Sequence, residues 1–250
     1  MHVTHNKIDA AAMSTPTYQT ASTQVQRARL YHFFQLALAH PGEDGFDYFS
    51  QQSTRQEFIE NYSCLFEKKD KLLDRGLKAA ETFFVKLQDH SYEEVESAYI
   101  GMFSTNFPHL PCPPYGSLFT AEDSDKRLEE MLAIKQFYQQ NGVDIADSFD
   151  DLPDHLCVEL EFSQLMCFRE NEASTAEEAE IIVGIRNAQA EFLDRFLLPL
   201  GNSLADTAAA TMPDNLYGSL LEAMRCYLIQ HRQELGLDAE SITQGQEIQS

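Results

Sequence analysis

The sequence predicts an all-α protein, a single globular domain of about nine or ten helices. Through most of the 250 residues, apolar side chains recur three and four positions apart, which is the spacing of one helix face. Period-2 alternation, hairpin dipeptides and internal repeats do not occur, so neither strands nor a repeat architecture is expected. The hydrophobic fraction of 43% is sufficient for a sizeable core.

The first predicted helix follows a polar leader. Residues 1–22 are small and polar without periodicity, so we expect them to be disordered. A helix is expected from about Thr23, because apolar residues between positions 30 and 38 lie on one face, and His40-Pro41-Gly42 ends it. Further helices are expected over residues 46–50, 54–66, 70–88 and 92–103.

A proline-rich loop then interrupts the helices at residues 104–118, STNFPHLPCPPYGSL, which hold four prolines. Its aromatic and apolar side chains predict a loop that packs against the protein. Helix resumes over residues 121–140 and is predicted to end at Asn141-Gly142. An acidic connection follows at residues 141–152.

Three more helices are expected in the second half of the chain. The first begins near Pro153, the second runs to about residue 198 and is expected to end at Pro199 and Gly201, and the third spans residues 213–235. The globular domain is therefore predicted to cover residues 23–235, followed by a flexible polar tail at residues 236–250.

Composition excludes several classes of protein. The net charge of −22 argues against a nucleic-acid partner, and residues 121–180 hold 17 acidic but only 4 basic side chains, which favours a basic partner. No run reaches the roughly 18 apolar residues of a membrane span, and the N-terminus has no export-signal pattern, so we expect a cytoplasmic protein without stable membrane insertion. The five cysteines show no paired spacing and are predicted to be reduced thiols.

Residues 150–168 carry the clearest candidate site. Apolar side chains surround this predicted helix, so it should be buried, and His155, Glu159 and Ser163 form its one polar edge at i, i+4 and i+8. His155 and Glu159 could be two metal ligands or an ordinary polar pair at a helix start. Because no third ligand and no HExxH motif accompanies them, neither a metal nor a cofactor is expected.

The remaining pattern indicates a binding surface. No nucleophile elbow or phosphate-binding loop occurs, so no enzymatic activity is expected. Carboxylates beside the polar edge could meet Arg or Lys of a peptide, while Tyr115 and Phe119 of the preceding loop supply apolar contact.

Four segments occur in a characteristic order: Glu96 to Phe103, LPCPPYGSLF at 110–119, FYQQNGV at 137–143 and LPDHLCVELEF at 152–162. Together they resemble the TorD/DmsD/NarJ family of molybdoenzyme maturation chaperones. The chain looks closer to TorD and DmsD, since Tyr115-Gly116-Ser117 is similar to the aromatic-x-Ser turn of DmsD-like members.

The resemblance implies a TorD-like fold and a function. It also implies a candidate hinge at residues 141–152, because such relatives can exchange helices between subunits there, so both a monomer and a domain-swapped dimer are compatible with it. Such chaperones bind the N-terminal leader, often a twin-arginine signal peptide, of an apo molybdoenzyme catalytic subunit, hold it from premature export and assist molybdopterin insertion. The peptide-binding residues that the resemblance implies here are Tyr115, Gly116, Ser117, Pro153, Asp154 and His155. Helical geometry adds Glu159, and the loop's apolar character adds Phe119.

Alternatives stay open at this point. One is a metal-dependent hydrolase that uses His155 and Glu159, and another is a helical interaction module without a molybdoenzyme client. Asp154 could contact a peptide, or it could only cap its own helix, a role worth about 1 kcal/mol of stability.

Overall fold

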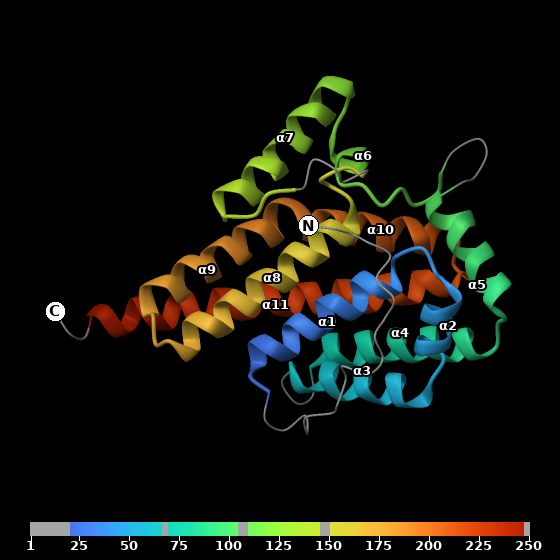
Figure 1. Ribbon diagram of the computed structural model, residues 1–250, viewed down its shortest axis with the longest axis horizontal. Coiled ribbons are helices and arrows are strands. Elements are labelled where there is room, and N and C mark those ends of the chain that lie inside the picture. The colour runs from blue at the N-terminus through green and yellow to red at the C-terminus, as the bar shows by residue number, and fades with distance from the viewer. Residues whose placement is uncertain (1–20, 67–69, 105–109, 146–150, 248–250) are drawn as a thin grey trace.

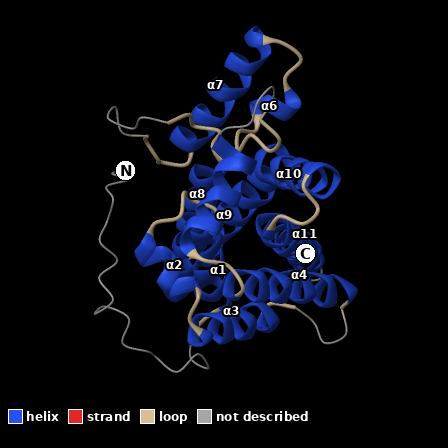
Figure 2. Cartoon of the chain, turned by 90° about the vertical axis from the view of Figure 1, so that its right-hand side faces the viewer, coloured by secondary structure: helices blue, strands red, loops and turns tan. Residues whose placement is uncertain are grey.

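The computed structural model describes residues 21–66, 70–104, 110–145 and 151–247, with residues 237–247 described by their backbone alone. Within these residues the chain forms α-helices, two π-helical segments and no strand, which confirms the all-α prediction (Figure 2). In chain order the elements are α1 (Thr23–Ala37), α2 (Glu43–Phe49), α3 (Gln52–Cys64), α4 (Lys71–Gln88), α5 (Tyr92–Tyr99), η3 (Ile100–Ser104), α6 (Ser117–Thr120), α7 (Ser124–Gln140), α8 (Leu156–Thr175), α9 (Ala179–Phe192), η4 (Leu193–Leu197), α10 (Leu198–Thr211) and α11 (Leu216–Glu247).

Two long helix pairs form the body of the protein. Helix α11 packs along α4, and α1 packs along α8, while α9 packs against α8 and α11, and α10 packs against α11 (Figure 1). Helices α6 and α7 lie at one edge of this body, and α7 projects from it (Figure 1). The edge where α6, α7 and the start of α8 come together contains the site described below.

The core is rich in aromatic side chains. Phe33 and Phe34 of α1 pack against Phe58 of α3, with ring centroids 4.3 Å and 5.7 Å from that of Phe58. Around α7, Phe137 packs against Phe192 at 5.5 Å, which anchors the C-terminal half of α7 to the body. Such clusters bury large apolar areas, which is the main favourable contribution to folding.

One helix boundary differs from the sequence prediction. Pro199 and Gly201 do not end a helix, because α9, η4 and α10 follow one another without a break up to Thr211. Pro199 comes just after the π-helical turn of η4, where the hydrogen-bond pattern has already departed from the regular α-helical one. A methyl group at Gly201 would lie 3.0 Å from Leu228 Cδ1, so this glycine permits close packing of α10 against α11.

The predicted ends of the domain are partly described. Residues 1–20 of the predicted leader and 146–150 of the candidate hinge lie outside the described residues. Helix α11 continues to Glu247, well past the predicted end at residue 235. The flexibility of the tail stays a prediction. No helix in the described part of the chain is both long and apolar enough to cross a membrane.

Candidate functional site

The proline-rich loop and the start of α8 lie side by side. Gly116 donates its backbone N–H to the Asp154 carbonyl at 3.0 Å, and Leu156 donates to the Pro114 carbonyl at 2.8 Å. These bonds form an isolated antiparallel bridge between Tyr115 and His155. Two segments that the sequence singles out separately are therefore one structural unit.

Asp154 ties this unit together. Its Oδ2 accepts the backbone N–H of Ser117 at 2.9 Å, at the first residue of α6. The cap of α8 is His155, whose Nδ1 accepts the Cys157 N–H at 3.1 Å. The alternative that Asp154 caps its own helix is therefore wrong, and the helix begins at Leu156, after Pro153 rather than at it.

A pocket of about 210 Å³ opens beside this unit. Three parts of the chain line it: α6 and α7, the junction of η4 with α10, and the loop with the start of α8. The lining residues are Thr120, Glu130, Ala133 and Ile134, then Arg195, Phe196, Pro199 and Leu200, and finally Gly116, Ser117, Asp154 and Glu159. The last four are sequence-predicted site residues.

Two carboxylates of the pocket are buried without full hydrogen bonding. Asp154 is 3% exposed and Glu159 is 1% exposed. In the described part of the protein, Asp154 Oδ1 and Glu159 Oε2 have no hydrogen-bond partner. Burial, reinforced by the nearby Asp154 charge, raises the pKa of Glu159 well above its usual value. Two residues of the pocket lining therefore each carry a buried carboxyl oxygen without a hydrogen-bond partner in the described structure.

Gly116 leaves room for these carboxylates. A methyl group on Gly116 would lie 3.5 Å from Glu159 Oε1 and 4.0 Å from the Asp154 Cβ. Its backbone is in the ordinary helical region, with φ −58° and ψ −47°, so the glycine is not required by the turn itself. A methyl group at this position would make ordinary van der Waals contacts with both side chains and would add to the lining of the pocket.

The polar edge of α8 lies deeper than the sequence suggests. Glu159 and Ser163 are both buried, and the Ser163 hydroxyl donates to the Glu159 backbone carbonyl at 2.9 Å. Only His155 keeps partial exposure. At the other end of the stretch, Phe168 is 39% exposed, although the sequence predicts a buried side chain there.

The other predicted residues lie outside the pocket lining. The Tyr115 hydroxyl donates to Asp151 Oδ1 at 3.0 Å, and its ring meets the His155 ring edge-on at 5.0 Å. Burial and the Asp151 charge raise the pKa of Tyr115 to about 12, whereas burial lowers the pKa of His155 against the effect of Asp151. Phe119 packs against the hydrophobic core. The Pro153 carbonyl accepts the Tyr138 hydroxyl at 3.0 Å.

Sequence reasoning missed the far wall of the pocket. The Arg195 guanidinium lies over the Phe196 ring at 4.9 Å and the Phe137 ring at 5.8 Å, and its Nη1 is 2.5 Å from Glu191 Oε1. The sequence predicts that a helix ends at Pro199, so it does not predict the continuous helical segment whose residues form this side of the pocket. No local motif marks Arg195 or Phe196 as pocket residues.

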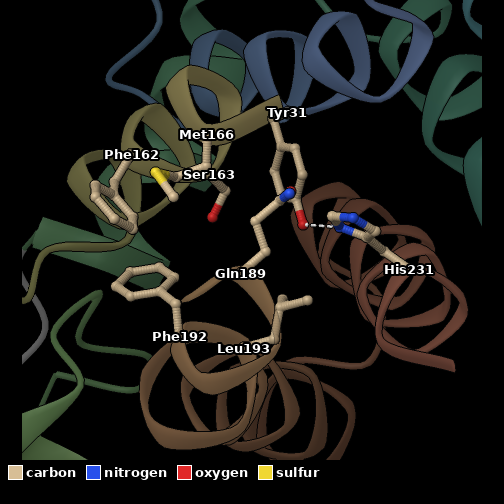
Figure 3. A pocket seen from close by; sticks show the side chains of 8 residues that line it. All are labelled: Tyr31, Phe162, Ser163, Met166, Gln189, Phe192, Leu193 and His231. Carbon is tan, nitrogen blue, oxygen red and sulfur yellow. Dashed lines mark hydrogen bonds between the residues drawn. The ribbon is translucent and has the colours of Figure 1, made fainter. Parts of the chain in front are cut away.

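A second group of polar side chains is enclosed in the body. The Tyr31 hydroxyl lies 2.7 Å from His231 Nδ1, beside Ser163 and Gln189 (Figure 3). This cavity has no space for a water molecule, so it is part of the core rather than a site. Elsewhere in the described residues, no group of three or more His, Cys, Asp or Glu side chains is placed to hold a metal ion.

The fold and the pocket together define the class of protein: it is all-α, with an acid-lined pocket at the edge of a helical body. The chain belongs to the nitrate reductase delta subunit family, whose family model matches residues 67–206. This match confirms the resemblance to the TorD/DmsD/NarJ chaperones. The branch within that family stays a prediction.

Individual relatives share low sequence identity with this chain. The chain is 25% identical over 154 residues to the perchlorate reductase assembly chaperone protein of Dechloromonas aromatica (strain RCB). That alignment covers 60% of this chain and 66% of the relative. A solved structure of a putative redox enzyme maturation protein from Archaeoglobus fulgidus aligns with a TM-score of 0.46 and 18% identity, over 86% of this chain and 98% of that chain.

Proposed function

We propose that the protein is a cytoplasmic chaperone, without enzymatic activity, for a DMSO reductase-type molybdoenzyme. It binds the N-terminal leader of the apo catalytic subunit, which we expect to be a twin-arginine leader. It holds this subunit back from export while the molybdopterin cofactor is inserted.

Membership of the family supports a role in assembly. The named relative is an assembly chaperone of perchlorate reductase, and this chain shares 25% identity with it across the aligned region. The proposal for this chain extends that kind of role to its own client.

The observation that carries the leader-binding part is the acid-lined pocket. Asp154 and Glu159 supply carboxylates for basic side chains, while Ile134, Phe196 and Leu200 supply apolar contact. A leader peptide combines basic and apolar residues, so its chemistry complements this lining. Leu128 and Leu132, on the projecting half of α7, are 55% and 48% exposed and add apolar surface in the same part of the molecule.

Calorimetric titration of the full chain with the leader peptide of a DMSO reductase-type molybdoenzyme from the same organism tests this proposal. Ala133→Met should weaken binding, because the larger side chain fills the pocket from α7. Lys135→Met is the matched control, since it places the same side chain on the exposed face of α7. If the leader does not bind, and deletion of the chaperone leaves client activity unchanged, the proposal fails.

A further inference from the structure

We propose that the pocket binds one basic side chain of the client between Asp154 and Glu159, and that Glu159 releases a proton to solvent as this cation enters. The inference rests on the proposed function and deepens it, because it specifies the chemistry of recognition. It makes client binding a proton-linked reaction that depends on pH.

The first observation is the pair of unsatisfied acceptors. Asp154 Oδ2 is used by the Ser117 N–H, but Asp154 Oδ1 and Glu159 Oε2 have no partner among the described residues. Buried carboxyl oxygens normally find a hydrogen-bond partner, so unpartnered ones on two residues of one pocket lining point to a ligand. The donor that suits two nearby carboxylates is a guanidinium or ammonium group.

The second observation concerns the charges that face Glu159. Asp154 lies beside it, Glu130 faces the pocket from α7, and the Tyr138 hydroxyl approaches from the same helix. Among the described residues that line the pocket, Arg195 is the one cation, and it is paired with Glu191 and stacked on aromatic rings. No described cation forms an ion pair with Asp154 or Glu159.

These surroundings explain why Glu159 holds a proton when the pocket is empty. Two close, buried carboxylates repel each other when both are charged, so one of them keeps a proton to a higher pH than usual. In this pocket that group is Glu159, whose pKa is raised by burial and by Asp154. A cation placed between the two side chains stabilises the charged form of Glu159, so the pKa of Glu159 falls and its proton passes to the buffer.

The shape of the pocket fits one long basic side chain. Its volume of about 210 Å³ far exceeds that of a single water molecule, and Asp154 and Glu159 belong to its lining and are themselves buried. Ile134, Phe196 and Leu200 can contact the methylene groups that precede the charged group. The pocket therefore selects one basic residue of a leader, and a second basic residue would be left outside it.

Calorimetry in two buffers of different ionisation enthalpy counts the protons released. The ligands are the client leader and copies in which citrulline, a neutral analogue of arginine, replaces each arginine in turn. We expect the native leader to release up to about one proton, and one citrulline copy to lose both this proton and about tenfold or more in affinity. Glu159→Gln should abolish proton release, whereas Glu161→Gln, on α8 outside the pocket lining, should retain it.

Two outcomes separate the inference from the proposed function. A leader that binds equally well with citrulline at every position, without proton release, overturns the inference and leaves the chaperone role intact. If no leader binds, N-acetyl-arginine amide is the probe, and infrared spectra report whether the protonated carboxyl band of Glu159 disappears. Loss of that band supports the cation pocket while the chaperone proposal fails, and an unchanged band overturns the pocket.

Discussion

Asp154→Asn separates the two roles that the structure combines in this side chain. Asparagine has nearly the same shape, and its carbonyl can still accept the Ser117 N–H. A hydrogen bond to a charged acceptor contributes about 1.5–3 kcal/mol and a neutral one about 0.5–1.5 kcal/mol, so the bond weakens by about 1 kcal/mol. Removing a buried charge beside Glu159 opposes this loss, so the net change in unfolding free energy should stay below about 1 kcal/mol.

Asp154→Ala provides the structural comparison. It removes the acceptor altogether and leaves the N–H of Ser117, a residue only 3% exposed, without a partner. Such a loss costs about 1–3 kcal/mol. Leader affinity should fall in both variants by about tenfold or more, equivalent to about 1.4 kcal/mol, because each removes one of the two pocket charges.

Urea unfolding and calorimetric titration on the same preparations measure both quantities. The reasoning predicts that asparagine nearly retains stability but loses affinity. It is refuted if asparagine destabilises the protein as much as alanine does while leader affinity is unchanged. Asp154 would then be a structural link between the loop and α8 only.

Three further predictions address the pocket and the core. The pKa of Glu159 is raised in the folded protein, so the unfolded chain loses this proton at a lower pH than the folded protein does. The unfolding free energy of the wild type, measured in urea, should therefore fall relative to that of Glu159→Gln as pH rises above about 4.5. A difference between the two proteins that does not change with pH would contradict this. Gly116→Ala should fold normally but bind the leader more weakly by calorimetry, because its methyl group occupies part of the pocket that Gly116 lines. Unchanged affinity would count against binding of the leader next to Gly116. Gly76→Ala should lower the unfolding free energy by about 3 kcal/mol, since its methyl group would overlap the Tyr62 hydroxyl and break its bond to the Ala223 carbonyl; a normal melting temperature would disprove this.

Local patterns were sufficient to predict most helices and two of the segments that form the site, the loop at 110–119 and the start of α8. The α7 stop at Asn141-Gly142 and the start of α1 near Thr23 follow from short-range signals of periodicity and capping. The loop at 110–119 and the start of α8 were recognisable for the same reason. Each signal depends on residues within a few positions of one another.

Prediction failed where the outcome depended on distant contacts. Pro199 and Gly201 read locally as a helix end, but the turn of η4 and the close approach of α11 accommodate both within a continuous helical segment. That continuity places Arg195 and Phe196 opposite the start of α8. No short-range rule carries this information, because it depends on how α10 packs against α11.

The acid-lined pocket shows the same division. The sequence by itself determined that Asp154 and Glu159 lie five positions apart near the start of one predicted helix. Only the tertiary structure decided that both are buried, that Asp154 binds the loop rather than its own helix, and that α7 and α10 enclose them. Burial and enclosure arise from packing between segments far apart in the chain, and these determine what the two carboxylates can bind.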